Sequence, residues 1–256
     1  MVGGSEIVMT DTQANGAAPG PSQASVPAGL VAAVVNLVGT GPVLLGAYTI
    51  AELTAVDAVV DFLEARPSDE VLTEAVRSLV ARQLIVAGPP GEQVQVRGDL
   101  GIAVAFEQRA RMVMDARATG TGPGEPWRIL LLPQPEQICL VYRIDTFGVH
   151  QIGLYTLDES LRQLTAWLPK GSQADPDPAM DADSVLASAE RSALITLTHY
   201  STQGSAEIAG ASTDLVLARH QGRLHLFSRD QDNPAKLVTS QWKGGSVQDT
   251  LAGLRM

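Results

Sequence analysis

The sequence predicts an α+β protein with an internally duplicated antiparallel sheet and an N-terminal helical subdomain. Three observations lead to this prediction. Residues 128–143 and 214–229 align without a gap, and in each copy a short turn separates two strand-like runs. In the second runs, apolar residues alternate with period two, as in a strand with one buried face. Both copies continue into another strand-like run and a short amphipathic helix. The matched pairs are Ile129 and Leu215, Leu131 and Leu217, Ile138 and Leu224, Leu140 and Leu226, and Arg143 and Arg229.

Composition narrows the classes of function. The 256 residues carry 18 basic and 28 acidic side chains, a formal net charge of −10, and hydrophobic residues make up 45%. No basic stripe is visible, so the field of the protein would repel phosphate backbones and anionic membrane surfaces. The uncharged run 29–51 is about as long as a membrane span, but Asn36 and the breaker at 39–42 divide it. The first basic residue is Arg66, too late for a signal peptide, so we expect a cytoplasmic protein.

The N-terminal part reads as a tail followed by helices. Residues 1–27 are poor in large apolar groups and are predicted to be a disordered tail. An apolar element, read as a helix, is expected over 28–38, and 43–50 suits a strand or the start of a buried helix. From Thr49 the apolar spacing becomes three and four residues, which predicts a helix that ends at Pro67.

A second helix is expected after Ser68, a good N-cap, with Asp69 and Glu70 at its positive end. A turn at 88–91 and a strand at 94–96 follow, so that residues 51–96 resemble a winged-helix unit. The helix offers only Arg77 and Arg82 against three acidic residues, which favours a helix pair packed on the rest of the domain. Its inward side chains are predicted to be Val71, Leu72, Ala75, Val76, Leu79, Val80 and Leu84.

The first repeat is flanked by further elements. A helix around 100–110 and a strand at 112–114 should precede it, and the glycine-rich loop 119–126 lacks the spacing of a phosphate cradle. A third strand is expected at 149–156, with Ile152 and Leu154 on one face. A helix follows at 157–168, with apolar side chains inward. These inward residues are Leu161, Leu164 and Leu168.

The second repeat follows an acidic, proline-rich linker at 169–183, in which the glycine and glutamate of a calcium loop do not occur at the required positions. We expect a short helix at 184–191, a strand at 194–199, a third strand at 237–241 and a helix at 246–254. Residues 28–168 and 184–256 would form one pseudo-twofold globular unit. The two repeats are predicted to form one continuous or closely packed sheet with helices on one side.

No motif of reaction chemistry is present, so no catalytic, cofactor-binding or metal-binding residue and no cofactor is predicted. Cys139 is expected to be a small buried apolar side chain. His220 and His225 flank the second turn and could lie near each other, but no acidic or cysteine ligand accompanies them. These two, like His150 and His199, are expected at the surface or at sheet edges.

The order of elements resembles the EspG family of type VII (ESX) secretion chaperones of actinobacteria. The segments that carry the resemblance are 78–85, 94–96, the helix up to Ala110, 112–114, the hairpin 128–144 with its strand and helix to Leu168, and 194–254. The resemblance implies a non-enzymatic cytoplasmic chaperone. Members of the family keep PE–PPE heterodimers soluble by covering an exposed apolar tip. The family has a second helical bundle between its halves, whereas here that region shrinks to the acidic linker and one short helix.

Other functions remain open at this point. Residues 51–96 could belong to a winged-helix transcriptional regulator or adaptor, and an enzyme with a dispersed site is a third hypothesis. The chain could also be a divergent relative with another partner, or an unrelated duplicated α+β protein. The expected partner is a protein, such as a small helical secretion substrate, and its contact residues are not assigned. Homo-oligomerisation through exposed sheet edges is open as well.

Overall fold

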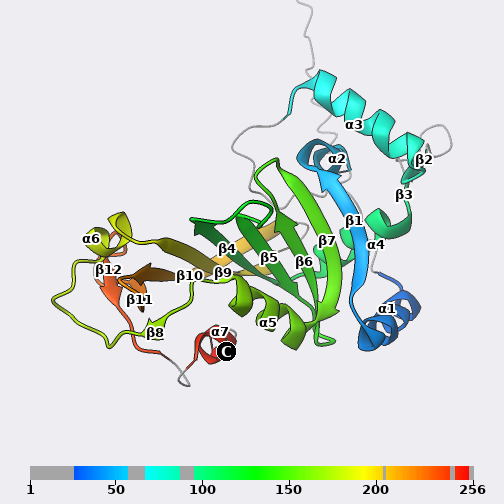
Figure 1. Ribbon diagram of the computed structural model, residues 1–256. Coiled ribbons are helices and arrows are strands. Elements are labelled where there is room, and N and C mark those ends of the chain that lie inside the picture. The colour runs from blue at the N-terminus through cyan, green and yellow to red at the C-terminus, as the bar shows by residue number, and fades with distance from the viewer. Residues whose placement is uncertain (1–25, 57–66, 87–94, 204–205, 243–245, 254–256) are drawn as a thin grey trace, which may run out of the picture.

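The computed structural model describes residues 26–56, 67–86, 95–203, 206–242 and 246–253 (Figure 1). The fold is mixed α+β and is built on a large, mainly antiparallel sheet of ten strands. The predicted tail, except residues 26 and 27, lies outside the described residues. Residues 57–66 of the helix that was expected to end at Pro67 lie outside them as well.

The N-terminal elements begin with α1 (Ala28–Thr40), which confirms the helix expected there, and β1 (Val43–Thr49). Helix α2 (Ile50–Ala55) starts at a capping box in which the Thr49 hydroxyl accepts from the Glu52 amide and the Glu52 carboxylate accepts from the Thr49 amide. Helix α3 (Asp69–Ala81) is capped by Ser68, as predicted. The strands β2 (Ile85–Val86) and β3 (Gln95–Val96) then pair with each other in a separate two-stranded sheet.

The strands of both halves lie in one sheet, in the order β1-β7-β6-β5-β4-β9-β10-β11-β12. Strands β4 and β9 pair antiparallel in the middle, from Met112 opposite His199 to Thr119 opposite Ser192. The edge strand β1 pairs with β7 at one end, and the three-residue β12 closes the other end. The strands not yet bounded are β4 (Met112–Thr119), β5 (Arg128–Pro133), β6 (Ile138–Ile144), β7 (Val149–Thr156), β9 (Arg191–Gln203), β10 (Ala206–His220), β11 (Arg223–Arg229) and β12 (Leu237–Thr239).

Helices cover both faces of the sheet, so the prediction of helices on one side is wrong. One face packs on α5 (Leu157–Trp167) and α7 (Val247–Gly253), which contact each other. The other face packs on α1 and α4 (Gly98–Arg109) at one end and on α6 (Ala182–Ala187) at the opposite end (Figure 1). Because side chains alternate across a strand, β5 and β6 contribute to the cores on both faces.

The gapless alignment of the two hairpins holds in the first strands and fails in the second. Residues 129 and 131 of β5, like 215 and 217 of β10, face α5 and α7. Ile138 of β6 faces the other core, whereas its aligned residue Leu224 of β11 faces α5 and α7. The cause is the turn, because Pro133 pairs with Cys139 while its aligned residue Arg219 pairs one position earlier, with Leu224. A slip of one residue exchanges the two faces of a strand.

The segment predicted to be an acidic linker contains a strand. β8 (Ser172–Gln173) pairs in parallel with the start of β11. The Ala174 carbonyl accepts a hydrogen bond from the Trp242 indole, and Ala174 itself is buried. The short helix of the second half begins at Ala182, two residues earlier than expected, because the Asp181 carboxylate caps it. The segment therefore packs against the second half of the sheet.

Candidate functional site

The side chains with potential chemistry are scattered. Cys139 is buried, as predicted, in the core beneath α5. His150 and His225 are also buried, so the prediction of surface histidines is wrong for these two, and burial lowers the pKa of both imidazoles. His220 and His225 do lie near each other, with ring centres 6.2 Å apart. Among the described residues, no group of three or more His, Cys, Asp or Glu side chains could hold a metal ion.

Helix α3 displays apolar side chains to solvent. Ala75 and Leu79 are its only buried residues. Three valines that the sequence predicted to point inward are instead 39–54% exposed. In Figure 1, α3 lies outside the large sheet, beyond α2. The valines are Val71, Val76 and Val80.

Two of these valines form a stripe with the half-buried Leu72, because the three residues are spaced by one helical turn. We call Leu72, Val76 and Val80 the α3 stripe. Large apolar side chains that are exposed together on one face of an element often mark a site that binds another molecule. The α3 stripe is therefore the first candidate for a contact surface.

Phe147 is the most exposed large apolar side chain of the described chain, at 91%. It sits in the turn between β6 and β7, and the Asp145 carboxylate accepts hydrogen bonds from the amides of Phe147 and Val149, both at 2.9 Å. Val149 pairs with Thr49, at the end of β1 where α2 begins. The turn therefore presents Phe147 at the same end of the sheet as α2.

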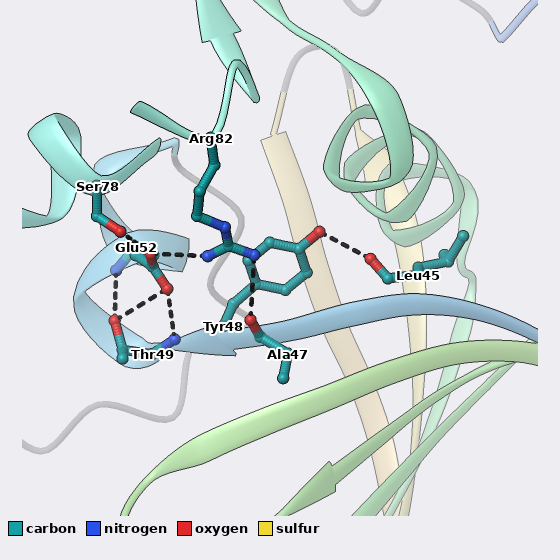
Figure 2. A network of polar contacts seen from close by, with 7 residues as sticks. All are labelled: Leu45, Ala47, Tyr48, Thr49, Glu52, Ser78 and Arg82. Atoms are coloured by element: carbon teal, nitrogen blue, oxygen red, sulfur yellow. Dashed lines mark hydrogen bonds and ion pairs between the residues drawn. The ribbon is translucent and has the colours of Figure 1, made fainter. Parts of the chain in front are cut away.

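A buried carboxylate ties α3 to β1 and α2 (Figure 2). Glu52 is 5% exposed. Its Oε1 accepts hydrogen bonds from Ser78 Oγ at 2.7 Å and from Arg82 Nη1 at 3.0 Å, and its Oε2 accepts from the Thr49 amide at 2.9 Å. The Arg82 guanidinium also lies 5.0 Å from the centre of the Tyr48 ring. Contacts between residues 48–52 and residues 78–82 thus fix one side of α3.

The tethered side of α3 differs from its apolar side. Ser78 and Arg82 are one helical turn apart and lie near the buried Ala75 on the helix surface. Val76 and Val80 lie farther round the helix and remain exposed. The network therefore holds the α3 stripe in a fixed orientation without covering it.

We expect Glu52→Gln to lower the free energy of unfolding by about 2 kcal/mol near neutral pH, because a charge-assisted network is lost. Burial acts to raise the pKa of Glu52, but the hydrogen bonds from Thr49 and Ser78 and the Arg82 charge outweigh it, so the pKa lies below its ordinary value. A depressed pKa stabilises the fold above the unfolded-state pKa, and this contribution disappears as pH falls through the folded-state pKa.

The measurement is urea unfolding of wild type and Glu52→Gln at several pH values. The difference between the two proteins should be largest near neutral pH and shrink as the pH falls below the unfolded-state pKa of a glutamate, about 4.3. Thr54→Val is a control on the same helix, because the Thr54 hydroxyl bonds only the carbonyl of its own helix, at Ile50. A difference that stays constant from neutral to acid pH would contradict the assignment of Glu52 as the charged centre.

A second buried charge pair lies in the sheet. Asp115 of β4 accepts two hydrogen bonds from Arg128 of β5, at 2.8 and 2.9 Å, and the side chains of both residues are 7% exposed. The exposed Arg117 donates two further hydrogen bonds to Asp115, at 2.8 and 3.0 Å. Because the carboxylate is already satisfied by guanidinium groups, this pair joins strands and offers no free acid or base.

The cations on α3 are engaged in ion pairs. Arg77 pairs with Glu74, and Arg82 pairs with Glu52. A helix that binds in a DNA groove needs cations that are available to the phosphates.

Among the described helices, none is long and apolar enough to cross a membrane.

Sequence reasoning placed these residues only in part. It found α3 and its cap, but it assigned the apolar face of α3 to the core. It did not single out Glu52, Phe147 or Asp115. The comparisons with known proteins add no relative, because no family model matches the chain and no curated protein matches it.

Proposed function

We propose that the chain is a non-enzymatic cytoplasmic protein-binding module that acts as a chaperone for type VII (ESX) secretion substrates. The observation that carries this proposal is the α3 stripe, an exposed apolar face on a helix that a buried polar network holds in place. The resemblance of the element order to the EspG family supplies the class of partner. The proposal fits a scaffold whose described titratable groups are scattered or already paired.

We further propose that the sheet descends from a duplication. The elements α4-β4-β5-β6-β7-α5 recur in the same order as α6-β9-β10-β11-β12-α7. The strand order is mirrored about the antiparallel pair β4 and β9, as expected for two equivalent units related by a pseudo-twofold axis. The longer turn between β5 and β6 then accounts for the change of register between the copies.

The partner would be a helical protein with an apolar tip. An amphipathic helix can pack an apolar face against the α3 stripe at the three- and four-residue spacing of helix pairs. The turn that displays Phe147 lies at the same end of the sheet and supplies an aromatic anchor, the type of residue that dominates binding energy in many interfaces. The net charge of −10 favours a neutral or basic partner.

The test is capture of a partner from an actinobacterial host that carries a type VII secretion system. The tagged full-length chain should retain a small helical secretion substrate, identified by mass spectrometry. In a host from which the gene for this chain has been deleted, that substrate should become insoluble. A captured protein without link to secretion, or a substrate that stays soluble after the deletion, would contradict the proposal.

A winged-helix regulator or adaptor is the second candidate, because the paired strands β2 and β3 follow α3 in the position of a wing. This function requires DNA binding that weakens steeply with salt. The ion pairs of Arg77 and Arg82 lead us to expect no gel shift of duplex DNA, even at low ionic strength. A salt-dependent shift would favour the regulator over the chaperone.

A further inference from the structure

A cavity of about 350 Å3 lies between α5 and the strands β5 and β6. Its floor is apolar and includes Ile129, Leu131 and Val141, and Leu164 and Trp167 of α5 form a wall. The cavity belongs to the face that packs on α5, whereas the α3 stripe is attached through Leu79 to the core of the opposite face. It is therefore separate from the surface proposed to bind a protein.

Arg143 of β6 lines this cavity and is half-buried. Its guanidinium forms neither a hydrogen bond nor an ion pair with any residue in the described part of the chain. The aligned residue Arg229 differs, because it pairs with Asp214. The one-residue slip between the hairpins places Arg143 on the α5 face and Arg229 on the opposite face.

The other polar groups of the cavity already have partners. Glu125 accepts hydrogen bonds from Arg191 Nη1 at 2.8 Å and from the Gly122 amide at 3.1 Å. The Gln163 amide nitrogen donates to Glu159, and the Ser160 hydroxyl donates to the carbonyl of Thr156, the N-cap residue of α5. No lining carboxylate thus compensates the charge of Arg143.

The walls of the cavity are held in place. Arg191 Nη2 donates to the Trp167 carbonyl at 2.7 Å, and the Trp167 indole donates to the Pro126 carbonyl at 2.9 Å. These contacts join the β4–β5 loop, α5 and β9 around the cavity. Because these residues are already ordered in the free protein, little binding free energy is lost in ordering the walls when a ligand binds.

We propose that this cavity binds a small amphipathic carboxylate. The planar Arg143 guanidinium matches a carboxylate through two parallel hydrogen bonds. An alkyl or aryl chain would lie against the floor formed by Ile129, Leu131 and Val141. The volume falls at the lower end of the range of small-molecule sites, about 300–1,000 Å3, so the ligand is compact.

The experiment uses octanoate as the probe and 1-octanol as a neutral probe of matched length, with the full-length chain observed by methyl NMR. Octanoate should shift the methyl signals of Ile129, Leu131 and Val141. Octanol should bind at least about tenfold more weakly than octanoate. Arg143→Gln should weaken octanoate binding about tenfold and leave octanol binding unchanged. Arg162→Gln is the control, because Arg162 is exposed on the same helix wall and pairs with Glu159.

A second variant separates loss of the cavity from loss of the fold. Ala166 is an exposed α5 residue that lines the cavity, so Ala166→Trp should obstruct it and abolish binding of both probes without lowering the melting temperature. The proposal is overturned if octanoate shifts no cavity methyl group up to its solubility limit. It is equally overturned if the two probes bind alike, or if Arg143→Gln leaves octanoate affinity unchanged.

Discussion

Replacing Asp115 by alanine should lower the free energy of unfolding by about 3–5 kcal/mol, because the substitution removes the buried carboxylate that pairs with the buried Arg128 guanidinium. Both Asp115 oxygens accept from Arg128, at 2.8 and 2.9 Å, and the pair joins β4 to β5 near the middle of the sheet. Urea unfolding followed by circular dichroism measures the change.

Two controls isolate the buried pair. Arg117→Ala removes only the exposed cation beside Asp115, so we expect a loss of less than about 1 kcal/mol. Replacing the pair together, as Asp115→Val with Arg128→Met, should recover most of the stability lost in Asp115→Ala, because both buried charges are replaced by apolar side chains. A single Asp115→Ala variant as stable as wild type would show that the pair does not hold β4 and β5 together.

The double variant Val76→Ser, Val80→Ser should weaken binding of the captured partner about 30- to 100-fold. The basis is the loss of about 2–3 kcal/mol of apolar burial at the interface. Both side chains are exposed in the free chain, and valine and serine have similar helix propensities, so the stability of the fold should change little. Isothermal titration calorimetry with the purified partner measures the affinity.

A matched double variant lies on the polar side of the same helix. Glu70→Ser with Glu74→Ser alters two exposed residues of α3 outside the α3 stripe. This variant should bind the partner nearly as well as wild type does. Equal losses in the two double variants would show that α3 acts through its stability or its charge and not through its apolar side chains.

The fold followed from the sequence wherever a local pattern sufficed. Period-two alternation located the second strand of each hairpin, β6 and β11, and the Ser68 cap with its two acidic neighbours located the start of α3. The helix after β7 was found from the spacing of Leu161, Leu164 and Leu168, and all three are buried. These features depend on residues within one element, so no tertiary information was needed.

The failures have a common physical cause, because each depends on contacts between distant segments. Helical spacing identifies an apolar face but not what covers it, and so Val76 and Val80 were assigned to the core. The alternation of apolar residues in β6 and β11 was visible in the sequence. Which face of the sheet the apolar residues of each strand occupy, however, changes when the preceding turn is one residue longer or shorter. The network at Glu52 joins residues 26 and 30 positions apart.

The central claim is that α3 contacts the partner through the α3 stripe. The most direct measurement is site-specific photocrosslinking in the host, with a photoreactive amino acid placed at position 80 in one variant and at position 74 in another. Both positions are exposed on α3. The account predicts a crosslink to the secretion substrate from position 80 and none from position 74. A crosslink from position 74 alone, or from neither position while the substrate is still captured, would contradict it.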